Sequence, residues 1–214
     1  MKKILEKLFD LDDEKKAEEF VQDVPSGKEK LAFGRGSEII IVSDNHRAKK
    51  GLVKVLNHYA YADCFLHCGD SNLEPDNDVM RPFITVRGNT DYQQGYGEDE
   101  FVELISGERI WITHGHRYSV NSGTDDLVRS AKFGSTSTRA EIPPIDIVLY
   151  GHTHRVDVKM QEGILVINPG SIARPRDGVH RTYARLQVTT DCYDVQILDI
   201  NDHSVLKEFR FPRE

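Results

Sequence analysis

The sequence predicts a layered α/β domain in which part of the β-sheet is built from hairpins. Short apolar runs rich in β-branched residues recur from residue 38 onward, as is typical of strands buried on both faces. Six of these runs end in a cluster of Asp, Asn, His, Gly or Ser. From residue 182 onward, apolar and polar residues alternate between turn residues, which indicates antiparallel strands.

The N-terminal stretch differs from the rest of the chain. Leu5, Leu8, Phe9 and Leu11 lie among Lys and Glu residues at roughly helical spacing, and no candidate catalytic residue occurs there. We therefore divide the chain into an N-terminal helical extension, residues 1–35, and one α/β domain, residues 36–214. We expect the extension to pack on the domain surface; an arm that docks a partner is the alternative.

The remaining elements follow in order along the chain. Helices are predicted over residues 48–58 and 124–133. Apolar strands are predicted over 38–42, 63–66, 83–86, 109–112, 145–149 and 164–167, and antiparallel strands over 182–189, 193–200 and 204–211.

Composition excludes several classes of protein. The 214-residue chain is 38% hydrophobic, and no run of about 18 apolar residues could cross a bilayer. We therefore expect no membrane association. The net charge of −7 has the wrong sign for a protein that coats nucleic acid, so we also expect no stable nucleic-acid partner. The odd set of cysteines, Cys64, Cys68 and Cys192, together with the lack of an export signal, predicts reduced thiols and a cytoplasmic location.

Polar residues after the strands supply a set of metal-ligand types. Two pairs have the form D-x-H and H-x-H, and single donors follow three other strands; the full set is Asp44, His46, Asp70, Asn89, His114, His152 and His154. Taken alone, most of these motifs are better explained by capping, packing or turn residues. Together they place seven oxygen or imidazole donors at strand ends, where open α/β sheets carry their sites.

The chemistry of these donors limits the metal. Histidine, carboxylate and amide ligands suit manganese, iron, zinc or cobalt, whereas a structural zinc more often recruits thiolates. Seven donors exceed what one four-coordinate ion uses. They suit two divalent ions that share a carboxylate, a recurring device for displacement at phosphorus.

The ordered series SDNH, HCGD, RGNTD, THGH, YGHTH and NPGS resembles the metallophosphoesterase (calcineurin-like) superfamily. Within it, the chain is most similar to the small bacterial and archaeal phosphodiesterases of the YfcE type, over roughly residues 38–198. The resemblance implies a four-layer fold: a β-sandwich of two mixed sheets flanked by helices, with the metals at one rim.

The resemblance also implies roles for the ligands. Asp44, His46 and His154 would hold the first ion, and Asp70 would bridge. Asn89, His114 and His152 would hold the second. Mn²⁺ is the expected metal for both positions, with Fe, Zn, Co and Ni as alternatives.

Four residues are assigned to the reaction itself, two of which are also predicted metal ligands. Asp70, Asn89 and His116 are expected to be catalytic, and Asn89, Thr90 and His116 to contact the substrate. The family often has His where this chain has Thr90, which puts protonation of the leaving group in doubt. His116 could instead hydrogen-bond a nearby loop.

Other residues near the motifs have two readings. Arg47 either lies near the site and attracts a phosphate, or is a solvated residue at the start of a helix. Arg155, Arg174 and Arg176 are either cationic groups at the site or solvated loop residues. His67 and Cys68, which precede Asp70, are interpreted as packing residues and not as ligands.

The predicted function is hydrolysis of a phosphodiester in a small phosphate-ester substrate by a metal-activated water. No G-x-S-x-G elbow and no G-x-x-x-x-G-K-[ST] loop offers another mechanism. The alternatives are a phosphomonoesterase, a nucleotide pyrophosphohydrolase, or an interaction scaffold of the same fold with a degraded site. The intact ligand set favours an enzyme, and a homo-oligomer is left open.

Overall fold

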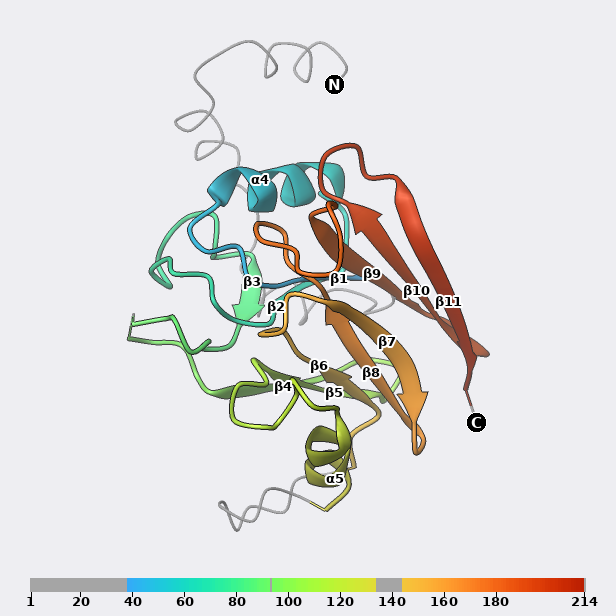
Figure 1. The fold of residues 1–214 in the computed structure, drawn as a ribbon. Helices are drawn as coiled ribbons and strands as arrows, with labels where there is room; N and C mark the ends of the chain where they lie inside the picture. The colour runs from blue at the N-terminus through green and yellow to red at the C-terminus, as the bar shows by residue number, and fades with distance from the viewer. Residues whose placement is uncertain (1–37, 93, 134–143, 214) are drawn as a thin grey trace.

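Two mixed β-sheets stack face to face in this computed structural model, which describes residues 38–92, 94–133 and 144–213 (Figure 1). The predicted N-terminal extension lies outside the described residues. The first sheet has six strands in the order β11-β10-β9-β1-β2-β3. Its strands are β1 (Glu38–Val42), β2 (Cys64–His67), β3 (Phe83–Thr85), β9 (Thr182–Val188), β10 (Cys192–Asp199) and β11 (Val205–Pro212).

The second sheet has five strands in the order β4-β5-β6-β8-β7. Within it β5, β6 and β8 are parallel, while β4 and β7 pair antiparallel at its two edges. Its strands are β4 (Asp99–Glu103), β5 (Arg109–Thr113), β6 (Ile147–Leu149), β7 (Val156–Gln161) and β8 (Ile164–Pro169).

The alternation of side chains along each central strand fills two layers of core at once. On β1, Ile39 and Ile41 point into the cluster between the two sheets, whereas Ile40 and Val42 point to the outer face. The neighbouring β2 divides in the same way, with Leu66 inside and Phe65 outside. Both faces are apolar because both are covered, as the continuous apolar runs predict.

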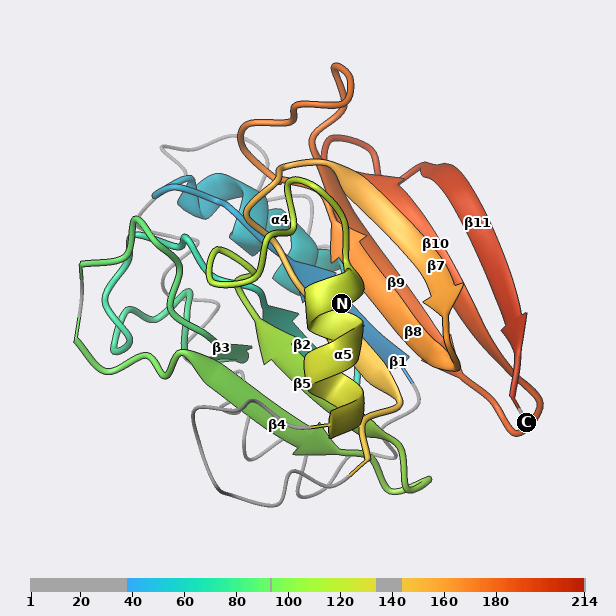
Figure 2. The same cartoon turned by 60° about the horizontal axis from the view of Figure 1, so that its bottom comes forward.

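One helix covers each outer face. Helix α4 (Lys49–His58) buries Leu52, Val55 and Leu56 against the six-stranded sheet. Helix α5 (Asp125–Phe133) buries its apolar side against the five-stranded sheet, over which it lies in Figure 2. The order of layers is helix, sheet, sheet, helix, which confirms the β-sandwich that the motif series implies. No helix among the described residues is long and apolar enough to cross a membrane.

Two strands were not predicted. In β4 only Val102 is buried, and the strand forms at the sheet edge because it pairs with β5. In β7, Val156, Val158 and Met160 pack on the core at every second position, a period that the sequence does carry. The predicted strand 145–149 is shorter in the structure: residues 145 and 146 precede β6.

Candidate metal centre

The loops that follow the parallel strands meet at one rim of the sandwich. Main-chain hydrogen bonds join them: the Asp44 amide donates to the Gly69 carbonyl, and the Gly151 amide donates to the His114 carbonyl. Five of the seven predicted ligands have left-handed backbone, with φ between 43° and 66°: Asp44, His46, Asp70, His152 and His154. This conformation is uncommon outside glycine and clusters at functional sites.

The first group of ligand atoms comes from Asp44, His46 and His154, whose atoms lie within 4.8 Å of one another. His154 Nδ1 is 2.6 Å from the Arg174 carbonyl oxygen, and His46 Nδ1 is 3.1 Å from Asn72 Oδ1. Both partners are acceptors, so each Nδ1 carries the hydrogen and each neutral ring presents a lone pair on Nε2. The two Nε2 atoms are 3.2 Å apart, and a cation beside them would offset the repulsion between their lone pairs.

The second group comes from Asp44, Asp70 and His114. His114 Nδ1 lies 2.7 Å from the Cys68 carbonyl oxygen, which again leaves a lone pair on Nε2. That Nε2 is 3.5 Å from Asp70 Oδ2 and 3.1 Å from Asn89 Oδ1, so three acceptor atoms converge.

Two of the predicted assignments depend on where Asp70 and His152 lie. Asp70 Oδ2 is also 4.0 Å from His46 Nε2, so one carboxylate oxygen lies between a histidine of each group. His152 belongs to neither group among the described residues; its Nδ1 is 2.9 Å from Asn89 Oδ1 and its ring centroid is 5.3 Å from that of His114. Asp44, in contrast, belongs to both groups.

The Asp44 carboxylate tests whether these residues suit a metal ion. It is completely buried, and Oδ2 accepts hydrogen bonds from the Ser43 hydroxyl and the His152 amide. Oδ1 makes no hydrogen bond and lies 3.1 Å from His154 Nε2. A buried carboxylate oxygen without a donor is costly unless a cation binds it. The residues fit a divalent ion with nitrogen and oxygen ligands.

The pKa values of the site follow the same charges. Burial lowers the pKa of His114, but the Asp70 and Asp44 carboxylates outweigh burial, so its pKa is raised. The same holds for His154. Burial lowers its pKa, but the Asp44 carboxylate raises it by more, so the net pKa is raised. For Asp70, burial raises the pKa, but the neighbouring His114 ring, when protonated, and the hydrogen bond from the Thr90 amide hold it well below its usual range. The carboxylates therefore favour cations at this rim.

Asp91 and Asn72 support the site and were not predicted. Asp91 is buried and accepts the amide hydrogens of Asn72 and Gly88, which ties the loops after β2 and β3 together. Asn72 orients His46 through Oδ1 and donates to the Thr90 carbonyl. The GNTD motif contains Asp91, but nothing in the sequence distinguishes Asn72 from a turn residue.

The NPGS segment supports the H-x-H pair. The Asn168 amide donates to the Gly151 carbonyl and to Thr153 Oγ1. The Ser171 hydroxyl donates to the Asp44 carbonyl and accepts the Arg174 amide, whose own carbonyl orients His154. This segment therefore holds two ligand loops in contact.

The remaining predicted residues lie around the ligands. The Thr90 amide donates to Asp70 Oδ1 at 2.8 Å, while its hydroxyl oxygen lies 3.1 Å from the Asn72 amide nitrogen. His116 is half-buried beside His114, at 5.4 Å between ring centroids, and its Nδ1 has no hydrogen-bond partner. Its Nε2 is 3.9 Å from Glu98 Oε2.

His67 and Cys68 are fully buried. The His67 ring bonds Asn45 through Nε2 and accepts the Gly69 amide through Nδ1, so neither nitrogen is left for a metal. Burial lowers its pKa to about 4. The interpretation of His67 as a packing residue agrees with this arrangement.

The fold and the candidate ligand groups are those of a protein that could bind divalent metal ions, and comparison with known proteins gives the family. The calcineurin-like phosphoesterase superfamily domain matches residues 38–191, and the chain belongs to this family. It is 31% identical over 162 residues to a probable metallophosphoesterase, YsnB of Bacillus subtilis, spanning 75% of this chain and 90% of that protein. It is 26% identical over 139 residues to the phosphodiesterase YfcE of Escherichia coli, spanning 62% of this chain and 65% of YfcE, just under two thirds.

Solved structures agree on the fold. A conserved uncharacterized protein of Streptococcus pneumoniae, described as a predicted phosphoesterase, matches with a TM-score of 0.74 at 32% identity, covering 83% of this chain and 98% of that one. Vps29 of Entamoeba histolytica, solved with zinc, matches with a TM-score of 0.61 at 21% identity, covering 82% of this chain and 98% of that one. At that identity, the likeness to Vps29 concerns the fold alone.

Proposed function

We propose that this chain is a metal-dependent phosphodiesterase that hydrolyses small phosphate esters in the cytoplasm, with residues 36–214 as the catalytic domain. The observation that carries the proposal is the convergence of imidazole lone pairs and carboxylate oxygens of His46, His114, His154, Asp44 and Asp70 at one rim. The phosphodiesterase named among its relatives supports the reaction class.

Two divalent ions, with Mn²⁺ as the proposed metal, fit the ligand set. Asp44, His46 and His154 would hold one ion, and Asn89, His114 and His152 the other, with Asp70 between them. Such ions polarise the phosphoryl oxygens and lower the pKa of a bound water to supply the nucleophile. The chain itself contributes position and charge, which account for most of the catalysis in phosphoryl transfer.

His116 is the proposed contact to substrate oxygens beside the second group. Burial lowers its pKa, and the neighbouring charge of His114 lowers it further, so the ring is neutral near pH 7 and can donate or accept one proton. Asn89 is exposed at the same place and could contact the substrate through its amide. Thr90 acts mainly through its amide, which orients Asp70.

The test combines metal content with turnover. Protein loaded with manganese should contain two ions per chain by elemental analysis and should hydrolyse bis(p-nitrophenyl) phosphate. The same preparation treated with a chelator should lose that activity and regain it on adding manganese. One ion or fewer at saturation would refute the dinuclear site.

Two rival functions give different outcomes in this assay. Faster hydrolysis of p-nitrophenyl phosphate than of the diester would indicate a phosphomonoesterase on the same site. Metal binding without turnover of any ester would indicate an interaction scaffold of the same fold. The retention of donors at all seven positions favours the enzyme.

A further inference from the structure

The arginines of the described residues fall into two sets. Eight form an ion pair with a carboxylate: Arg81, Arg87, Arg109, Arg117, Arg129, Arg185, Arg210 and Arg213. Five form no ion pair with any described carboxylate, and all five are exposed: Arg47, Arg155, Arg174, Arg176 and Arg181. In a chain of net charge −7, this unpaired set is unexpected.

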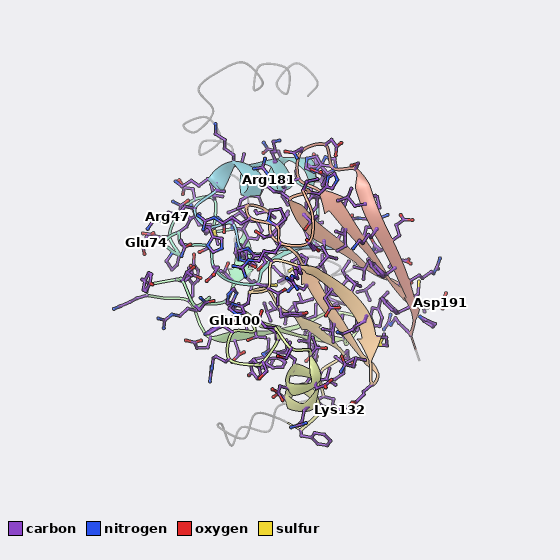
Figure 3. The ribbon with its side chains drawn as sticks, viewed as in Figure 1. Arg47, Glu74, Glu100, Lys132, Arg181 and Asp191 are labelled. Atoms are coloured by element: carbon purple, nitrogen blue, oxygen red, sulfur yellow. The ribbon has the colours of Figure 1, made fainter. Side chains whose placement is uncertain are left out.

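Four of the five unpaired arginines either follow a ligand of the first group directly in sequence or form a hydrogen bond with one through their own main chain. Arg47 directly follows His46, and Arg155 directly follows His154. The Arg174 carbonyl accepts the His154 Nδ1 hydrogen, and the Arg176 amide donates to the His154 carbonyl at 2.9 Å. The fifth, Arg181, ends the same loop; Figure 3 shows it and Arg47 toward the end of the molecule that carries α4.

The loop that carries three of these arginines is fixed to the site. Ser171 ties it to the Asp44 carbonyl, and Asp177, the one acidic residue in 171–181, uses Oδ2 to accept the Val156 amide. The main chain at Arg174 and Arg176 is therefore held beside His154, and no carboxylate of the described residues forms an ion pair with either guanidinium group. Clustered guanidinium groups repel one another, and an anion that binds among them relieves the repulsion.

The other side of the site has the opposite arrangement. Arg87 and Arg117 both lie near Glu98, at 3.5 Å and 3.9 Å, and His116 faces the same carboxylate. Among the described residues, arginines form ion pairs with a carboxylate beside the His114 group and form none beside the His46–His154 group. One scissile phosphoryl group between the two ions does not account for that asymmetry.

We propose that the substrate carries a second phosphate group, one that is not cleaved, and that Arg155, Arg174 and Arg176, with Arg47 at the edge, bind it beside His46 and His154. The proposal rests on the phosphodiesterase function proposed above. It narrows the substrate to esters with at least one further phosphate, and guanidinium groups suit a phosphate because they can contact two of its oxygens at once.

The test uses two substrates with one leaving group. These are the 5′-p-nitrophenyl ester of thymidine 5′-phosphate and the same ester with an added 3′-phosphate. With manganese, the added phosphate should raise kcat/KM by about tenfold or more, because hydrogen bonds between charged groups are worth that much. The preference should decline as salt is raised.

Variants assign the effect to the loop. In the Arg174→Gln, Arg176→Gln double variant, the preference should fall to within about twofold of unity. Arg129→Gln, which removes an ion-paired arginine of α5, should retain the full preference. Calorimetry should show the same pattern for thymidine 3′,5′-bisphosphate against thymidine 5′-monophosphate, and thermal melting should show that each variant is folded.

The outcomes separate this proposal from the proposed function. Hydrolysis of neither ester would refute the phosphodiesterase function. Hydrolysis of both with equal kcat/KM, or a preference that persists in the folded double variant, would refute the second-phosphate site while leaving the function intact.

Discussion

Asp70 lies where the two groups of metal ligands meet. Its Oδ2 faces His114 Nε2 at 3.5 Å and His46 Nε2 at 4.0 Å, while Oδ1 accepts the Thr90 amide. A carboxylate in this position offsets the repulsion between two cations, which a neutral amide cannot do. The residue therefore serves both halves of the site.

Asp70→Asn should weaken the binding of both manganese ions, each by about 100-fold or more, because second-shell losses alone cost 10–100-fold. Titration calorimetry measures both affinities. His46→Ala is the matched comparison and should weaken mainly one ion. Two ions bound with near-normal affinity by Asp70→Asn would contradict the bridging role.

If the chain is the proposed phosphodiesterase, Thr90 should make its rate depend strongly on the leaving group. A general acid beside the leaving oxygen contributes about 10²–10⁴-fold, and a threonine hydroxyl cannot supply a proton near neutral pH. Aryl diesters should therefore be cleaved well and alkyl diesters poorly. Thr90→His should raise the relative rate on poor leaving groups, provided that the imidazole reaches the leaving oxygen past Asn72, which now contacts the hydroxyl.

The measurement is a plot of log kcat/KM against leaving-group pKa for the wild type and Thr90→His. The wild-type slope should be steep, and the variant slope shallower. A flat wild-type plot would show that another residue already acts as the acid, and His116→Ala would then be the variant to compare.

At the scale of elements, the loop after β6 approaches the loop after β1 closely enough to require glycine. A Cβ on Gly151 would overlap the Ser43 hydroxyl and lie 2.9 Å from Asp44 Oδ2. The Ser43 hydroxyl is itself the donor to that oxygen. The contact therefore joins backbone packing directly to the position of a metal ligand.

Gly151→Ala should lower the free energy of unfolding by about 1–3 kcal/mol, the usual cost of overpacking, and should also weaken manganese binding. Denaturant unfolding and calorimetry measure the two effects. Gly178→Ala is the control, since its Cβ would have no atom within 4 Å. If Gly151→Ala bound manganese normally, the loops would have to be able to separate without moving Asp44.

For the whole molecule, the effect of pH on folding stability depends on whether metal is bound. Folding raises the pKa of His114 and of His154, because their carboxylate neighbours outweigh burial. A raised folded-state pKa gives stability that is present below the unfolded value, about 6.5, and is lost as pH rises through the raised value. Asp70 has a lowered pKa, so its contribution is lost only in acid, as pH falls below about 4.

Taken alone, the raised pKa values of these two histidines would make metal-free protein less stable as pH rises from about 6 to 8. Four other histidines have lowered pKa values, which act in the opposite direction over the same range: His67, His116, His152 and His203. Manganese needs the ring nitrogens of His114 and His154 deprotonated, so its affinity should increase over that range. The rise in melting temperature on adding manganese should accordingly be larger at pH 8 than at pH 6. An increment that is independent of pH would show that these two histidines do not bind the ion.

Nine of the eleven strands and both helices of the described residues, and the series of polar motifs, could be predicted from the sequence. The β1 run EIIIV and the runs before HCGD and THGH are continuous and apolar because both faces of each strand are buried, so local composition carries the signal. Edge strand β4 carries no such signal, since only Val102 is buried and pairing with β5 maintains it. The order of the motifs predicted the family and the sandwich.

Only the tertiary structure decided which donors meet and what holds them. It placed Asp44 in both ligand groups, joined Asn72 to His46, and brought the Ser171 loop against Asp44 from 127 positions away in the chain. It also showed which of the described arginines form ion pairs with carboxylates and which do not. The physical reason is that hydrogen bonds and ion pairs depend on distances between atoms of different loops, and those distances exist only once the two sheets have packed.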